Sequence, residues 1–133
     1  MFIKKPLLAE SLVISGAILI LHLLALNLFL YWTVEWFDIL MHFLGGLFIG
    51  IFSSYVLFGS GLFKIKSHAV ILFIVVMASV LVVGLTWELW ELFAGLSSVL
   101  RDQFDTVLDL VMDTLGGLVA FYYVKKKLWM IEN

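Results

Sequence analysis

The sequence contains no cysteine and a single proline, and only 14% of its residues are charged. Without cysteine there is no disulfide framework, no thiolate nucleophile and no cysteine-based zinc or iron–sulfur site. Any metal site would have to be built from His, Asp and Glu. The one proline, Pro6, precedes the first apolar run, and no Pro/Ser-rich linker or low-complexity tract divides the chain. We therefore treat residues 1–133 as a single transmembrane domain.

The chain is strongly apolar: 64% of its residues are hydrophobic and the mean hydropathy is +1.16. A helix needs roughly 20 apolar residues to cross a bilayer core about 30 Å thick. Four runs of that kind cover about residues 7–32, 37–58, 69–94 and 106–124. They are too long for β-strands and do not alternate. The sequence predicts an all-α integral membrane four-helix bundle.

Basic residues are placed unevenly along the chain. Seven lysines lie at the N-terminus, in the second loop and at the C-terminus: Lys4, Lys5, Lys64, Lys66, Lys125, Lys126 and Lys127. The opposite side has Arg101 alone. Lys and Arg stay preferentially on the cytoplasmic side of a membrane. We therefore predict a multi-pass protein of the cell (cytoplasmic) membrane with both termini inside.

The acidic residues gather on the other side, in the outer half of the predicted bundle. Eight of the ten belong there: Glu35, Asp38, Glu88, Glu91, Asp102, Asp105, Asp109 and Asp113. Glu88 and Asp113 lie about two turns inside their helices, roughly 10 Å at 1.5 Å per residue. A charge at such a depth costs at least ~2.5 kcal/mol, so several acids without a Lys or Arg partner require a cation, protons or water.

An internal repeat relates the second and fourth predicted helices. Residues 38–49 read DILMHFLGGLFI and residues 109–120 read DLVMDTLGGLVA, with six identities in twelve positions. We interpret them as equivalent parts of two tandem helical hairpins related by an axis along the membrane normal. Each segment carries a glycine pair, Gly45–Gly46 and Gly116–Gly117, and glycine lets helices approach closely in lipid. The glycines are predicted to bring the two segments face to face.

Helical spacing places the polar residues of the repeat on one stripe of each helix, since positions i, i+4, i+7 and i+8 share a face. Asp38 and His42 precede one glycine pair, and Asp109 and Asp113 precede the other. The third helix adds Glu88. The predicted outer-leaflet cluster contains Asp38, His42, Glu88, Glu91, Asp105, Asp109 and Asp113. Whether His22 of the first helix joins it is left open.

Three interpretations of this cluster remain. It is a divalent metal site in which Asp38, His42, Glu88, Asp109 and Asp113 bind Mg, Mn, Ca or Zn, because oxygen-rich ligands with imidazole suit these ions. It is a set of interhelical hydrogen-bonding groups that only hold the bundle together. Or it is part of an ion or proton path, which the apolar residues below Gly46 and Gly117 do not favour.

Three residues are candidates for binding a substrate: Arg101, and the cluster members Asp105 and Glu91. Arg101 is the one outward cation, and it either pairs with Asp102 or Asp105 or takes a phosphate or carboxylate group bidentately. An apolar stripe in residues 96–104 predicts a short interfacial helix that could cover the cluster.

Three segments, FDILMHFLGG (37–46), TWELWE (86–91) and FDTVLDLVMDTLGG (104–117), resemble small prokaryotic membrane proteins of the YjdF-like and VanZ-like type. Those proteins carry an Asp-x-x-x-His-Phe motif, a Glu-bearing third segment and a closing Asp-x-x-x-[Asn/Asp]-x-x-Gly. The matching positions are Asp38, His42 and Phe43, then Glu88 and Glu91, then Asp109, Asp113 and Gly116. Asp105-Thr106-x-x-Asp109 is closer to the YjdF side.

The resemblance implies a functional cluster but no reaction. The VanZ type is associated with teicoplanin resistance at the cell envelope. VanZ-like proteins usually show a basic residue after the first Asp and a Gln after the Glu, where this sequence has Ile39 and Glu91. That difference argues against an antibiotic-related role.

The leading functional hypothesis is an outward-facing, metal-dependent hydrolase or transferase that acts on a lipid or polyprenyl-type envelope amphiphile. Glu88 or His42 would serve as general base and Arg101 as anion contact. The alternatives are an envelope structural or interaction protein and an ion or proton transporter. No organic cofactor and no nucleic-acid partner is indicated, and a homodimer could complete the core of so short a chain.

Overall fold

The computed structural model describes residues 4–63, 65, 68–95 and 103–132. Its elements in chain order are α1 (Lys4–Leu28), α2 (Leu30–Thr33), α3 (Glu35–Ser54), the π-helical turn η1 (Tyr55–Gly59), α4 (Ala69–Ala94) and α5 (Gln103–Glu132). Four segments are long and apolar enough to cross a membrane: Pro6–Leu28, Glu35–Gly59, Ala69–Ala94 and Phe104–Leu128. The predicted all-α membrane bundle is thereby confirmed.

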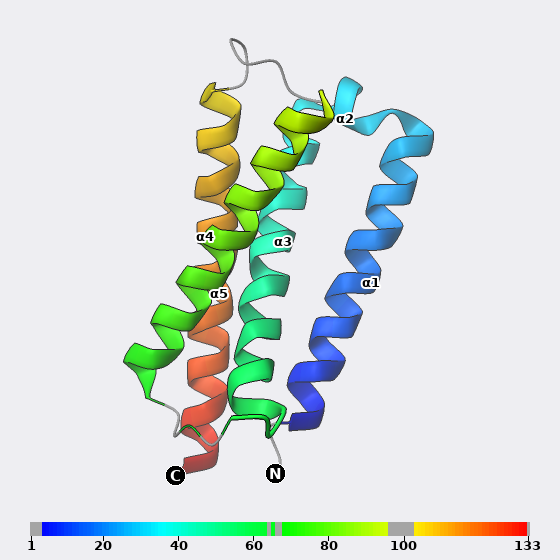
Figure 1. Cartoon of the computed structure of the whole chain (residues 1–133). Coiled ribbons are helices and arrows are strands. Elements are labelled where there is room, and N and C mark those ends of the chain that lie inside the picture. Colours follow the sequence, from blue (N-terminus) through cyan, green and yellow to red (C-terminus); the bar gives the residue numbers. More distant parts are fainter. Residues whose placement is uncertain (1–3, 64, 66–67, 96–102, 133) are drawn as a thin grey trace.

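The first apolar run is not one helix. α1 ends at Leu28 because Phe29 adopts a left-handed conformation, with φ 58° and ψ 33°. The single turn of α2 follows, and Val34 then extends the chain (φ −128°) before α3 begins. The predicted span 7–32 therefore divides at Phe29, and α2 connects the end of α1 to the start of α3 (Figure 1).

The other helix bounds differ from the prediction mainly at the C-terminus. α4 has the predicted bounds, whereas α5 extends well beyond residues 106–124, to Glu132. The extension continues to bury apolar surface, since Leu128 lies in the core. A search for apolar runs stops at the lysines of residues 125–127, although lysine is a good helix former. Most of the interfacial helix predicted for residues 96–104 lies outside the described residues.

Helices α3, α4 and α5 pack against one another, and α1 packs against α3 and η1 at the side of this group (Figure 1). The buried hydrophobic cluster contains Leu7, Ile51, Leu72, Val76, Val80, Ala120, Phe121, Val124 and Leu128. Large apolar side chains such as Val13, Val70 and Phe93 are exposed, as expected where a helix faces lipid. The start of α1 and the end of α5 lie at the same end of the bundle.

Helices α3 and α5 make the closest contact in the bundle, and glycine permits it. A Cβ atom on Gly46 would overlap the backbone carbonyl of Asp113, and one on Gly116 would overlap the carbonyl of Phe43. One glycine of each pair therefore lies at the α3–α5 contact. Gly117 instead faces Val80 of α4, at 2.9 Å from its would-be Cβ. The second glycine pair thus serves two helix contacts rather than one.

Candidate metal centre

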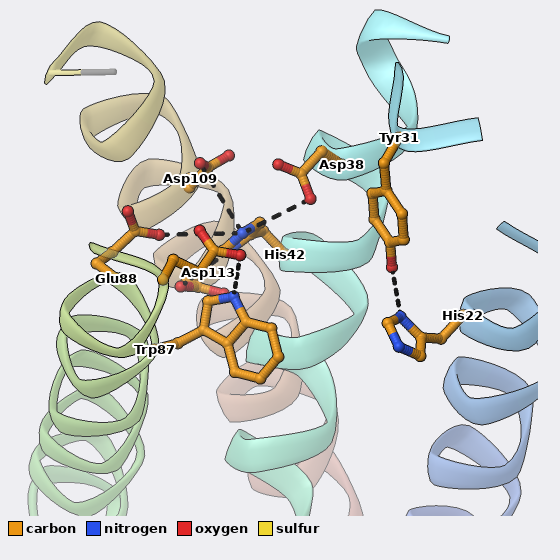
Figure 2. A network of polar contacts seen from close by, with 9 residues as sticks. His22, Tyr31, Asp38, His42, Trp87, Glu88, Asp109 and Asp113 are labelled. Carbon is orange, nitrogen blue, oxygen red and sulfur yellow. Dashed lines mark hydrogen bonds and ion pairs between the residues drawn. The ribbon is translucent and has the colours of Figure 1, made fainter. Parts of the chain in front are cut away.

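His42 lies at the centre of a buried polar cluster formed by α3, α4 and α5 (Figure 2). Its side chain is 7% exposed, and its two ring nitrogens face different groups. Nδ1 lies 3.4 Å from Oδ2 of Asp113. Nε2 lies 4.0 Å from Oδ1 of Asp38, 4.0 Å from Oε1 of Glu88 and 3.9 Å from Oδ2 of Asp109. Three helices thus direct carboxylates toward one imidazole nitrogen.

The helical register explains how these groups meet. Asp38 and His42 are one turn apart on α3, and Asp109 and Asp113 are one turn apart on α5, so each pair shares a face. The glycine contact between α3 and α5 lies directly below both pairs. Close approach of the two backbones therefore brings the two polar stripes together, and Glu88 joins them from α4.

Two oxygen atoms of this cluster are buried without a hydrogen-bond partner among the described residues: Oε1 of Glu88 and Oδ1 of Asp109. The separations of 3.9–4.0 Å around Nε2 exceed the 2.7–3.2 Å of a direct hydrogen bond. A buried polar group without a partner is costly. These groups face a common point rather than one another.

That common point suits a cation. Asp38, His42 and Asp109 each offer one ligand atom, and the three atoms lie within 4.8 Å of one another. Metal–ligand bonds of about 2.0–2.6 Å bridge atoms at such separations. The three residues could therefore form a metal site, with Glu88 at its edge. Asp113 lies on the opposite edge of the His42 ring.

The candidate centre is open on one side and closed on another. The Asp38 side chain is 36% exposed, against 4% for Asp109 and 11% for Glu88, so Asp38 marks the accessible side. Toward the other end of the bundle, Val76 and Val80 belong to the hydrophobic core, and the buried hydroxyls of Ser11 and Ser54 donate to backbone carbonyls of their own helices. An ion or substrate would enter from the Asp38 side.

The substrate-binding candidates are not among the residues that surround Nε2 of His42. Glu91 is half-buried and accepts a hydrogen bond of 2.9 Å from the indole nitrogen of Trp87. Asp105 is exposed near the start of α5. Arg101 lies outside the described residues, so its predicted role as an anion contact stays a prediction.

His22 does not join the cluster. Its Nδ1 lies 2.8 Å from the hydroxyl of Tyr31, and the pair lies toward α1, apart from His42 (Figure 2). The Tyr31 ring packs edge-on against Phe37, with 5.3 Å between ring centroids. Burial, together with the nearby charges of Asp38 and Glu91, raises the pKa of Tyr31 to about 12. The phenol therefore keeps its proton and holds α1 to the α2 turn.

Sequence reasoning missed Gly84, which lies against the cluster on α4. A Cβ at Gly84 would lie 2.6 Å from Oδ2 of Asp113. The available signal was its position one turn before Glu88, on the face of α4 that carries the acid. It stands alone in the sequence, outside the two glycine pairs, and a contact with another helix could not be foreseen from it.

Fold and site together define a multi-pass membrane protein with a buried His/acid cluster in the half of a four-helix bundle that lies away from the start of α1 and the end of α5 (Figure 1). The chain belongs to the family described as "Predicted membrane protein (DUF2238)", which matches residues 4–128. The match includes all four spanning helices and every residue of the cluster. Comparison with curated proteins gave no match, and comparison with solved structures gave none.

Proposed function

We propose that this protein binds a divalent metal ion through Asp38, Nε2 of His42 and Asp109, and that the ion serves a reaction at the outer face of the cell membrane. The observation that carries the proposal is the convergence of three carboxylates from three helices on one buried imidazole nitrogen at 3.9–4.0 Å. Such a group of negative charges inside a membrane protein needs a cation or protons to be stable.

Glu88 is the residue best suited to act as general base. It lies beside the three ligands, and its buried Oε1 has no hydrogen-bond partner among the described residues. His42 is less suited, because Nε2 is assigned to the ion. In a hydrolysis, Glu88 would take a proton from water while the water oxygen attacks a phosphoryl or acyl centre. The bond to the leaving oxygen breaks, and that oxygen takes up a proton.

The substrate class follows from where the cluster lies. It sits within spanning helices and is accessible on the Asp38 side, near the outer end of the bundle. An amphiphile in the outer leaflet, such as a lipid or polyprenyl phosphate, can bring its polar group there without leaving the membrane. The alternative, acids that only hold the bundle together, leaves two buried oxygens without a partner among the described residues.

Metal binding by purified protein tests the proposal. The protein in detergent is stripped with a chelator and dialysed against Zn²⁺, Mn²⁺, Mg²⁺ or Ca²⁺ in turn, and metal per chain is measured. We expect about one ion per chain for at least one of the four. Asp109→Asn should lose it and Glu35→Gln should keep it, because Glu35 is exposed on the first turn of α3. Equal retention by wild type and Asp109→Asn, or none by wild type, would contradict the proposal.

A further inference from the structure

Glycines of two neighbouring helices lie against Asp113. Gly46 of α3 abuts its backbone carbonyl, and Gly45 approaches Oδ1 at 3.8 Å from the would-be Cβ. Gly84 of α4 faces Oδ2, with only 2.6 Å to the would-be Cβ. Asp113 itself is 6% exposed. Gly45 and Gly84 therefore face the two carboxylate oxygens of Asp113, and Gly46 faces its backbone.

The oxygen that Gly84 faces is also the one that meets His42. Oδ2 of Asp113 lies 3.4 Å from Nδ1, and the two atoms form a long hydrogen bond. A carboxylate accepts and cannot donate, so Nδ1 must carry a proton to make this bond. In a neutral imidazole the other nitrogen then has a free lone pair. That nitrogen, Nε2, is the one directed at Asp38, Glu88 and Asp109.

We infer that Asp113 is a positioning residue: it holds the proton of His42 on Nδ1 and so presents Nε2 to the ion, while Gly84 keeps the carboxylate in reach. This inference rests on the proposed metal site. It takes Asp113 out of the predicted set of ligands and gives Gly84 a role. Carboxylates that orient a metal-binding histidine raise the basicity of the ligand nitrogen, and their loss typically costs 10–100-fold in metal affinity.

Nitrogen NMR on protein labelled with ¹⁵N-histidine tests the inference, with His22→Gln and His68→Gln variants used to assign His42. Nδ1 of His42 should carry a proton in chelator-treated protein and should keep it after addition of whichever of the four ions the protein retains. Only the chemical shift of Nε2 should change when that ion is added. Asp113→Ala should lose the Nδ1 proton signal and bind the ion 10–100-fold more weakly. A wild-type Nδ1 without a proton would overturn the inference by itself, whatever the variants do.

Gly84→Ala provides a second test, because it leaves every ligand in place. The added methyl group should displace Oδ2 of Asp113 and weaken the signal of the proton on Nδ1 of His42. It should also lower metal affinity, as Asp113→Ala does. Gly16→Ala is the matched control, since nothing lies within 4 Å of a Cβ at Gly16. Unchanged affinity and an unchanged Nδ1 signal in Gly84→Ala would contradict the role of Gly84. A protonated Nδ1 with no response of Nε2 to any ion would instead refute the metal site and leave the hydrogen bond standing.

Discussion

Gly46 of α3 lies against the backbone carbonyl of Asp113 on α5. The closest helix contact in the bundle therefore includes a residue of the His/acid cluster. Helix packing and the site are therefore set by the same few residues. A substitution that separates α3 from α5 should also disperse the carboxylates that converge on His42.

Gly46→Ala should destabilise the protein by about 1–3 kcal/mol, because a Cβ there overlaps backbone atoms that cannot rotate away. Unfolding in mixed micelles, followed by tryptophan fluorescence, measures the effect. Gly16→Ala should be neutral or stabilising by up to about 1 kcal/mol, since Ala favours a helix over Gly and the space is open. Equal stability of the two variants would show that the α3–α5 contact is not as close as described.

Tyr31→Phe should cost about 1 kcal/mol of stability and leave metal binding unchanged. The substitution removes the hydroxyl that bonds His22 at 2.8 Å, but His22 lies apart from the cluster and Tyr31 is not among the proposed ligands. Unfolding and metal dialysis on the same sample measure both quantities. Tyr122→Phe, at an exposed position of α5, is the control for loss of a hydroxyl. A strong loss of metal in Tyr31→Phe would mean that His22 and Tyr31 belong to the site.

Glu10 and Lys127 form an ion pair that links α1 to α5, and Lys127 also donates to the Tyr123 hydroxyl at 3.2 Å. Both side chains are partly buried, at 30% and 19% exposed. Glu10→Gln and Lys127→Gln should each destabilise the protein, and the double variant should lose less than the sum, with a coupling of about 1 kcal/mol. Strict additivity in this double-mutant cycle would mean that the pair does not hold α1 in place.

The orientation in the membrane is testable because the chain has no cysteine. Glu35→Cys should react with a membrane-impermeant maleimide in intact cells, whereas Leu62→Cys, at a position 76% exposed, should react only after permeabilisation. The seven lysines on one side and the single arginine on the other give the direction. The reverse labelling pattern would place the cluster in the cytoplasmic half and contradict an outward-facing site.

Much of this architecture could be predicted from the sequence because lipid imposes a simple rule on helix length. The predicted bounds 69–94 are correct, since His68 precedes that run and the left-handed Gly95 ends the helix. The break at Phe29 was not predictable, because a left-handed non-glycine residue leaves no mark in an apolar stretch. The extension of α5 past residue 124 was missed for the opposite reason, because lysines end a hydrophobic run without ending a helix.

For the candidate cluster, the sequence predicts which residues share a face of each helix, but not how they are arranged around His42. Spacing of i, i+4 aligned Asp38 with His42 and Asp109 with Asp113, and the structure brings both pairs together. Spacing could not distinguish the two edges of the imidazole, which separate Asp113 from the other acids. Nor could it show that Gly84 of another helix confines that carboxylate, since this depends on tertiary contact.

The central claim is that Nε2 of His42 binds an ion together with Asp38 and Asp109. Pulsed electron paramagnetic resonance of Mn²⁺ bound to ¹⁵N-histidine-labelled protein tests this most directly, because it detects nitrogen bonded to the metal. We expect coupling to one imidazole nitrogen, retained in His22→Gln and His68→Gln and lost in His42→Gln. Bound Mn²⁺ without nitrogen coupling, or coupling that persists in His42→Gln, would contradict the account.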